Sequence, residues 1–232
     1  MKKIEFYFDI SSPYSYLAHE QIKLFEKNNK FSVTFMPILL GGIHQLANIT
    51  APGLNPSRAK HMIKDLKICA DWYKIKFQFN RYFPLKTINI MRGAIVAEKE
   101  GFLKNYTESF FKAAWVDSLN LNDNKILEKF LKNLDINPSK FLEKINNQKI
   151  KDDLKNRTTA AYKKGVFGAP TFIVGSKIFF DKINDQNIKD ELKNRTAAAY
   201  KKGVFGAPTF IVGSKMFFGQ DRLEFVYREA KK

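Results

Sequence analysis

The sequence is poor in the residues that redox and metal sites usually need. Its 232 residues include a single cysteine, Cys69, so neither an internal disulfide nor a Cys-x-x-Cys pair is present. Cys69 falls within a helical pattern of apolar residues, which predicts a buried core position. The three histidines show no metal-ligand spacing, and we expect no metal site.

Long apolar runs are also lacking. No stretch approaches the roughly 18 consecutive apolar residues of a membrane-spanning helix. Lys2 and Lys3 resemble the start of a secretion signal, but Glu5 and Asp9 fall where such a signal needs an apolar segment. We therefore expect a cytoplasmic protein that does not insert into membranes.

The strongest compositional bias is a formal net charge of +17. The lysines are scattered along every segment rather than gathered into runs, and no zinc-finger or RNA-binding motif accompanies them. Nucleic acid is therefore not an expected partner, whereas a positive field suits a small anionic ligand. With 44% hydrophobic residues, the chain can form an ordinary globular core.

The N-terminal segment predicts a β-α-β unit with a site at its first turn. Residues 3–10 predict a buried strand, and residues 31–38 predict a second one. Between them, Ser12 is a suitable helix N-cap and Pro13 a suitable first helical residue. This is the layout of a thioredoxin-type redox site in which serine replaces both cysteines. A helix N-terminus stabilises a thiolate, and the Ser12 hydroxyl can donate a hydrogen bond to a sulfur that a ligand brings in.

A block of helices follows this unit. Gly41 and Gly42 are typical of a loop at its start. Trp72, Tyr73 and Trp115 lie within the block and could either line a substrate pocket or belong to the core; we expect a core position for each. The helical pattern covers residues 57–74, 87–100, 103–116, 123–134 and 138–147.

The last third of the chain contains an internal repeat. Residues 145–180 align with residues 183–218 at an offset of 38, and 31 of the 36 aligned positions are identical. Each copy predicts a helix followed by a β-hairpin, with Ala-Pro before the first strand of the hairpin. Two near-identical units are too few for a solenoid, so a recent duplication or an error in the gene model explains them better.

Several motifs that occur in order carry a family resemblance. Ser-Pro-Tyr-Ser at residues 12–15, Gly-Val-Phe-Gly-Ala-Pro-Thr-Phe at 203–210 and Phe-Gly-Gln-Asp-Arg-Leu at 218–223 resemble signatures of 2-hydroxychromene-2-carboxylate isomerases and kappa-class glutathione transferases. The resemblance covers nearly the whole chain except one repeat unit. It implies an α/β thioredoxin-like fold with a large all-helical insertion, to which this chain adds a duplicated helix–hairpin unit near the C-terminus.

The resemblance also implies a glutathione site, with Ser12 as the catalytic residue that faces the glutathione sulfur. The Ala-Pro corner would pair with the cysteinyl part, and the corner before the final helix would receive the γ-glutamyl end. Simpler roles stay open: helix capping by Ser12 or Asp221, an ordinary trans Ala-Pro turn, and a solvated surface position for Arg58. The candidate glutathione-binding residues are Asn48, Arg58, Ala207, Pro208, Gln220 and Asp221.

The function that the resemblance implies is glutathione-dependent isomerisation. The glutathione thiolate would add to 2-hydroxychromene-2-carboxylate, allow rotation about the former double bond, and leave again to give the open-chain benzylidenepyruvate. Transferase or peroxidase chemistry with glutathione is a near alternative, and a non-catalytic peptide-binding module is a more distant one. The expected partners are glutathione, a small aromatic or conjugated carbonyl substrate, and a second copy in a homodimer.

The two copies of the repeat compete for one place, because a thioredoxin-like sheet has room for one hairpin beside its first strand. We expect the second copy to occupy it, since that copy leads directly into Gln220, Asp221 and a final helix over residues 221–231. The expected domains are a thioredoxin-like domain of residues 1–38 and 183–232, a helical insertion of residues 39–147, and an extra copy of the unit at residues 145–182.

Overall fold

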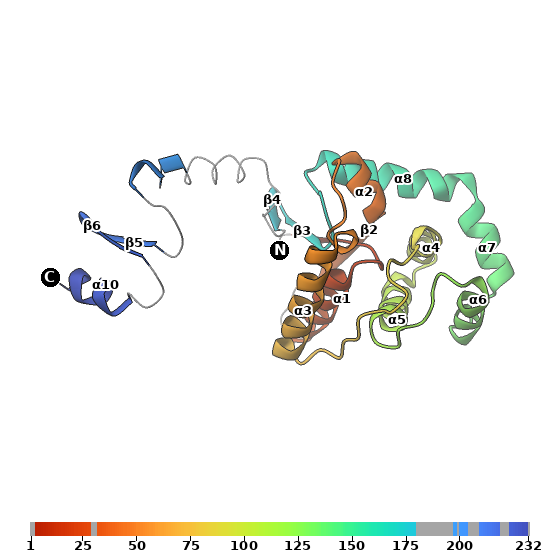
Figure 1. Cartoon of the computed structure of the whole chain (residues 1–232). Helices are drawn as coiled ribbons and strands as arrows, with labels where there is room; N and C mark the ends of the chain where they lie inside the picture. Colours follow the sequence, from red (N-terminus) through yellow and green to blue (C-terminus); the bar gives the residue numbers. More distant parts are fainter. Residues whose placement is uncertain are drawn as a thin grey trace. The chain divides into compact units, whose positions relative to one another are not determined.

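The computed structural model describes residues 3–28, 32–179, 197–198, 200–203, 209–218 and 223–231. These residues belong to two compact units, one formed by residues 1–180 and the other by residues 181–232 (Figure 1). The first unit contains a four-stranded sheet and a large set of helices, and the second contains a two-stranded sheet and a C-terminal helix.

The sheet of the first unit is mixed. Its strand order is β2-β1-β3-β4, with β1 at Ile4–Phe8, β2 at Val33–Pro37, β3 at Thr171–Val174 and β4 at Lys177–Phe179. Strand β1 is parallel to β2 and antiparallel to β3, and β3 is antiparallel to β4. Helix α1 (Pro13–Asn28) connects the two parallel strands, so the β-α-β prediction for the N-terminus is confirmed.

The sheet takes its hairpin from the first copy of the repeat. Both β3 and β4 lie in residues 145–180, whereas β5 (Thr209–Val212) and β6 (Lys215–Phe218) of the second copy form a two-stranded sheet of their own. The expected domain of residues 1–38 and 183–232 is therefore wrong, and residues 145–182 are not an extra copy outside the sheet. The strands β3 and β5 have the same sequence, so they do not favour either copy. The first copy reaches β1 without a further 38-residue excursion of the chain, which would add loop-closure entropy.

The predicted helical insertion is present between β2 and the hairpin. Local capping explains several boundaries: the side chains of Asn55, Asp123 and Asn137 each accept a backbone N–H at the start of α3, α6 and α7. The helices of this block are α2 (Leu40–Leu46), α3 (Pro56–Tyr73), α4 (Ile88–Lys99), α5 (Leu103–Trp115), α6 (Asn124–Asn133) and α7 (Pro138–Asn146), with a 3-10 turn at Pro52–Leu54. The helix of the first repeat copy, α8 (Gln148–Lys163), follows the block.

The expected loop at Gly41 and Gly42 is wrong, because both residues lie in α2. A Cβ atom at Gly42 would lie 3.1 Å from the Thr158 Cγ2 atom of α8. This glycine therefore permits a close approach between α2 and α8 rather than a turn.

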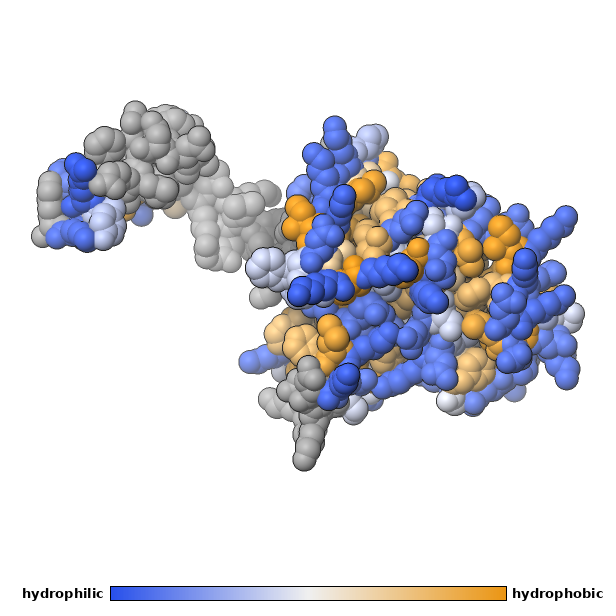
Figure 2. Space-filling view, turned by 90° about the horizontal axis from the view of Figure 1, so that it is seen from below, coloured by the Kyte–Doolittle hydropathy of each residue, from blue (hydrophilic) through white to orange (hydrophobic). Residues whose placement is uncertain are grey.

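The two faces of the sheet are covered by different helices. Phe6, Phe8 and Phe35 belong to a large core with side chains of α1, α3, α4 and α5, whereas Tyr7 and Ile173 belong to a smaller core with side chains of α2 and α8. This division follows from the alternation of side chains along a strand. Figure 2 shows polar side chains interspersed with apolar ones over the visible face of the first unit.

The expected core positions of the helical block are only partly confirmed. Trp115 is fully buried, but Trp72 is 80% exposed and Tyr73 is also exposed. Cys69 is partly buried and packs against the core rather than within it. Trp72 and Tyr73 lie at the C-terminal end of α3, where the helical period alone does not show which face meets the rest of the protein.

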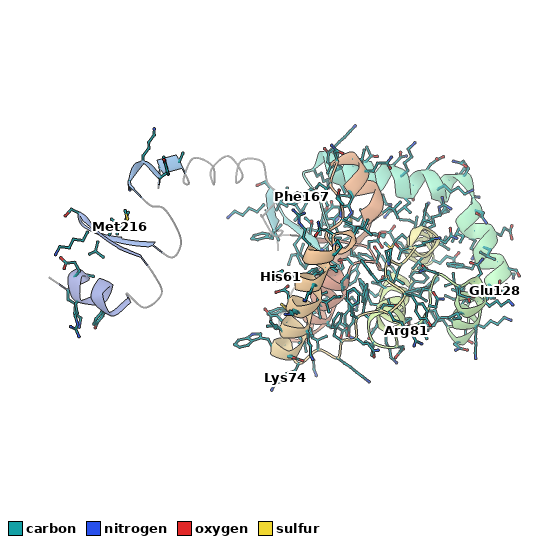
Figure 3. All side chains as sticks on the ribbon, viewed as in Figure 1. His61, Lys74, Arg81, Glu128, Phe167 and Met216 are labelled. Atoms are coloured by element: carbon teal, nitrogen blue, oxygen red, sulfur yellow. The ribbon has the colours of Figure 1, made fainter. Side chains whose placement is uncertain are left out.

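The second unit repeats the hairpin geometry of the first. Val212 pairs with Lys215 and Ile211 with Met216, just as Val174 pairs with Lys177 and Ile173 with Ile178. Helix α10 (Leu223–Ala230) contacts β5, and Met216 is labelled on β6 in Figure 3. The second copy therefore preserves its strand register outside the four-stranded sheet.

Candidate functional site

Ser12 lies where the sequence predicts it, in the turn between β1 and α1. Its hydroxyl oxygen accepts the N–H of Ser15 at 3.1 Å, which confirms the capping role. The same hydroxyl donates to the carbonyl oxygen of Ala169 at 2.8 Å. Ser12 is 3% exposed, so this side chain is held between the start of α1 and the segment that enters β3.

The segment that faces Ser12 is the Ala-Pro corner of the first copy. The bond between Ala169 and Pro170 is cis, and β3 begins at the next residue, Thr171. The Thr171 hydroxyl donates to the carbonyl oxygen of Gly168 at 2.8 Å and closes the corner. Phe167 lies on the same segment between α8 and β3 (Figure 3).

This arrangement corrects the assignment of the corner to Ala207 and Pro208. The residue in contact with Ser12 is Ala169, and the cis proline that follows it is Pro170. Ala207 and Pro208 lie outside the described residues, as do Gln220 and Asp221.

Asn48 and Arg58 are not brought to Ser12 by any hydrogen bond in the described part of the chain. Asn48 follows α2 in a left-handed conformation, with a φ of 52°, and is exposed. Arg58 lies in the first turn of α3, where its backbone N–H donates to the capping side chain of Asn55 and its own side chain is exposed. Both remain candidates for the outer part of a ligand.

The second serine of the motif is buried. The Ser15 hydroxyl has no hydrogen-bond partner among the described residues, and Ser15 is fully buried. Tyr14, between the two serines, donates its hydroxyl to Asp65 of α3 at 2.8 Å. Ser12 is therefore the serine of the pair whose hydroxyl lies at the corner, while Ser15 lies within the protein.

The turn that carries Ser12 is fixed by the helical insertion, which the sequence does not reveal. The indole N–H of Trp115 donates to the carbonyl oxygen of Ile10 at 2.8 Å, and the N–H of Ile10 donates to the Met91 sulfur at 3.5 Å. The Asp9 carboxylate accepts hydrogen bonds from α2 and from the start of α4. The sequence shows an acidic residue, Asp9, three positions before Ser12, but only the structure shows that it is buried.

Burial is the largest cause of the pKa shifts of Asp9 in this turn, His44 on α2 and Cys69 on α3. Burial raises the pKa of the Asp9 carboxyl, although its hydrogen bonds act in the opposite direction. Burial also lowers the pKa of His44 on α2, while the charge of Asp9 acts to raise it. At Cys69, burial and the charge of Asp65 both raise the thiol pKa, which disfavours a reactive thiolate there.

Metal sites and membrane-spanning helices are two further features to consider in the described part of the chain. No group of three or more His, Cys, Asp or Glu side chains there is arranged to hold a metal ion. None of the described helices is long and apolar enough to cross a membrane. A surface hollow lined by Glu5, Lys164 and Ser176, among others, lies at the end of β3 opposite Thr171, and thus away from Ser12.

Comparison with known proteins defines the family. The family model of the DSBA-like thioredoxin domain matches residues 3–184 and matches again at residues 179–230. The chain therefore belongs to the DSBA-like thioredoxin domain family. The fold of the first unit, a thioredoxin-like sheet with a helical insertion, agrees with this assignment.

Curated relatives are of two kinds. The chain is 25% identical over 184 residues to the 2-hydroxychromene-2-carboxylate isomerase of Sphingobium xenophagum, covering 77% of this chain and 91% of that protein. It is 27% identical over 180 residues to glutathione S-transferase kappa 1 of Caenorhabditis elegans, covering 73% of this chain and 79% of that protein. The resemblance seen in the sequence motifs is confirmed at the level of these two groups.

Solved structures give the same fold. A 2-hydroxychromene-2-carboxylate isomerase aligns with a TM-score of 0.69 at 19% identity, covering 88% of this chain and 99% of that one. The cytosolic disulfide reductase DsbM of Pseudomonas aeruginosa, in a structure with GSH, aligns with a TM-score of 0.53 at 14% identity, covering 84% and 99%.

Proposed function

We propose that this protein is a glutathione-dependent isomerase that interconverts 2-hydroxychromene-2-carboxylate and its open-chain benzylidenepyruvate. Bound glutathione would supply a thiolate that adds reversibly to the conjugated substrate and is returned unchanged. The observation that carries the proposal is the contact between the Ser12 hydroxyl and the carbonyl oxygen of Ala169. It joins a hydroxyl donor at a helix N-terminus to a backbone group at the start of β3.

These groups fit a thiol ligand with a peptide backbone. The Ser12 hydroxyl has one proton, which it now donates to Ala169. If the hydroxyl turns toward a sulfur atom, the carbonyl of Ala169 becomes free to accept an amide N–H from the ligand. The Ser12 oxygen can keep the Ser15 N–H throughout, because it accepts that bond through a lone pair.

The chain also favours the ionised form of a thiol at this place. The N-terminus of α1 directs backbone N–H groups and the positive end of the helix dipole toward Ser12. A net charge of +17 supports the attraction of an anionic tripeptide to the protein. Donors fixed in advance around a developing charge are typically the largest contribution to catalysis.

The remaining contacts with glutathione involve residues outside the Ser12 turn. Arg58 is a candidate for the glycyl carboxylate and Asn48 for a further contact with the ligand. Gln220 and Asp221, which the resemblance gives to the γ-glutamyl end, follow the second copy of the hairpin in the sequence, whereas Lys182 and Ile183 stand at the corresponding positions after the first copy. We also propose a cytoplasmic location and a homodimer.

Glutathione transfer is the second candidate, because kappa-class transferases match the chain about as well as the isomerases do. The two reactions differ in the fate of glutathione. An isomerase leaves its concentration unchanged while substrate is converted, whereas a transferase consumes one glutathione for each conjugate. Glutathione measured alongside the conversion of a chromene carboxylate or a conjugated electrophile therefore distinguishes them.

The proposal is tested by replacing the hydroxyl. Ser12→Ala should lower turnover with glutathione by about 10²–10³, since one preorganised donor is lost. Ser176→Ala, in the exposed turn between β3 and β4, is the matched control and should keep wild-type turnover. Wild-type turnover in Ser12→Ala, or failure of the wild type to bind glutathione in a titration, would refute the proposed site.

A further inference from the structure

Asp9 is a buried acidic residue whose carboxylate accepts hydrogen bonds from three parts of the chain. Its side chain is fully buried, at 0% exposure. One carboxylate oxygen accepts the N–H of Ser11 at 2.9 Å and the hydroxyl of Thr87 at 2.7 Å. The other accepts the N–H of Leu40 at 2.7 Å. One side chain thus connects the Ser12 turn to the first residue of α2 and to the N-cap of α4.

Asp9 contacts the N-termini of α2 and α4, and neither helix is capped by the side chain of its own N-cap residue. Thr87 is the N-cap residue of α4, yet its side chain makes no cap hydrogen bond within that helix. Leu39 is the N-cap residue of α2 and has no polar side chain to offer. Threonine usually caps a helix at this position. Here the Thr87 hydroxyl is directed to Asp9, and Asp9 satisfies an N–H at the start of α2.

Asp9 also holds the backbone of the turn. Its carbonyl oxygen accepts the N–H of Ser12 at 3.0 Å, while its carboxylate accepts the N–H of Ser11. Both the main chain and the side chain of Asp9 therefore hold the turn that places the Ser12 hydroxyl against Ala169.

We propose that Asp9 is a positioning residue, which acts through Ser12 by holding the turn against α2 and α4 so that the Ser12 hydroxyl stays at the Ala169 corner. The effect of Asp9 on turnover rests on the proposed use of glutathione. Its effect on the position of Ser12 holds whether or not the protein uses glutathione. Asp9 is not assigned a proton-transfer role, because both carboxylate oxygens are already occupied by donors.

The test removes one of the three donors rather than the carboxylate. Thr87→Val keeps the shape of the side chain and removes the hydroxyl, and Thr87→Ser restores it. Thr107→Val is the matched control, because Thr107 is equally buried and its hydroxyl has no hydrogen-bond partner among the described residues. Asp9→Asn is the stronger variant, since its amide cannot accept all three bonds.

The first readout needs no glutathione. Amide NMR signals of Ser12 and Ala169 should shift in Thr87→Val, return in Thr87→Ser, and stay in place in Thr107→Val. Unchanged Ser12 and Ala169 signals in Thr87→Val would overturn the proposal, whether or not the protein binds glutathione.

The second readout separates positioning from general loss of structure. In Asp9→Asn we expect kcat to fall roughly 10- to 100-fold with little change in KM for glutathione, because the reacting atoms are misplaced while the other contacts of the ligand remain. Thr87→Val should show the same split at smaller size, and Thr87→Ser should recover kcat. Equal loss in Thr87→Val and Thr107→Val would contradict the proposal, whereas a wild type without glutathione binding would refute the proposed function alone.

Discussion

Two stretches of nearly identical sequence have different surroundings in this protein. In the first copy, β3 lies between β1 and β4, Ile173 is 7% exposed, and Ala169 contacts Ser12. In the second copy, β5 pairs with β6 in a two-stranded sheet, and Ile211, the counterpart of Ile173, is 44% exposed. The hairpin register is the same in both.

Some properties of a hairpin are determined by its own sequence, and others by the segments that pack against it. Turn and strand register recur in both copies, so they are determined by the local sequence. Among the described residues, the hairpin that pairs with β1 has the buried isoleucine and is preceded by the contact with Ser12. The candidate site therefore depends on where a copy lies in the fold, and the sequence of the copy alone does not determine it.

Truncation of the same isoleucine in each copy should give the largest difference. Ile173→Ala should lower the free energy of unfolding of the first unit by about 2–4 kcal/mol, because it leaves a cavity between the sheet and α8. Ile211→Ala should lower it by less than about 1 kcal/mol, since that side chain is partly exposed. Urea unfolding followed by tryptophan fluorescence checks this, since both tryptophans lie in the first unit.

Similar losses in the two variants would contradict the comparison. A small loss in Ile173→Ala together with a large one in Ile211→Ala would mean that the second hairpin occupies the sheet in solution. An intermediate loss of unfolding free energy in both variants would indicate that the two copies exchange, because each could then replace the other beside β1.

A smaller difference is expected for Thr158 and Thr196, the matched threonines of the two copies. The Thr158 hydroxyl on α8 accepts the N–H of Leu39 at 3.0 Å and donates to the carbonyl oxygen of Leu154 at 2.8 Å. Thr158→Val should cost about 1–2 kcal/mol, because the N–H of Leu39 loses its acceptor. The matched Thr196→Val change in the second copy should leave the unfolding midpoint of the first unit unchanged, and an equal shift would count against the assignment.

The smallest effect concerns a charge network between α8 and α4. Arg157 lies 2.6 Å from a carboxylate oxygen of Glu98 and 2.7 Å from one of Asp153, and Lys99 lies 3.0 Å from Asp153. Burial acts to raise the pKa of Asp153, but its bonds with Arg157 and Lys99 outweigh burial and hold that pKa below its ordinary value. This contribution to stability is therefore present at neutral pH and is lost as the pH falls through the lowered pKa.

Arg157→Gln should therefore destabilise the first unit by about 0.5–1 kcal/mol at neutral pH. The difference from the wild type should shrink on acidification, as Asp153 becomes protonated in both proteins. Thermal unfolding across acidic and neutral pH checks the trend. Arg195→Gln in the second copy is the control, and a pH-independent difference for Arg157→Gln would contradict the assignment to this network.

Much of the fold follows from the sequence. Alternation predicts β1 and β2, and helical spacing with capping residues such as Asn137 predicts five of the helices of the insertion. Ser12 is predicted at the N-terminus of α1 by its position before Pro13. These features depend on residues that are near one another in the chain, for which local propensity and periodicity are sufficient.

Other features were missed because they depend on contacts between distant segments. The choice between the two Ala-Pro corners depends on which hairpin pairs with β1, and identical strands cannot reveal it. Gly42 lies in α2, where it closely approaches Thr158, 116 positions later in the sequence, and no local pattern reveals that contact. The Asp9 network joins three segments, so its importance was not visible from the motif around Ser12.

We propose that glutathione binds at Ser12 against the first copy of the repeat. The most direct measurement is an NMR titration of the full chain with glutathione, in which the amides of Ala169 and Ala207 are assigned. The signals of Ser12 and Ala169 should shift in a saturable manner while that of Ala207 stays in place. A saturable shift of Ala207 with an unchanged Ala169 would contradict binding at the first copy.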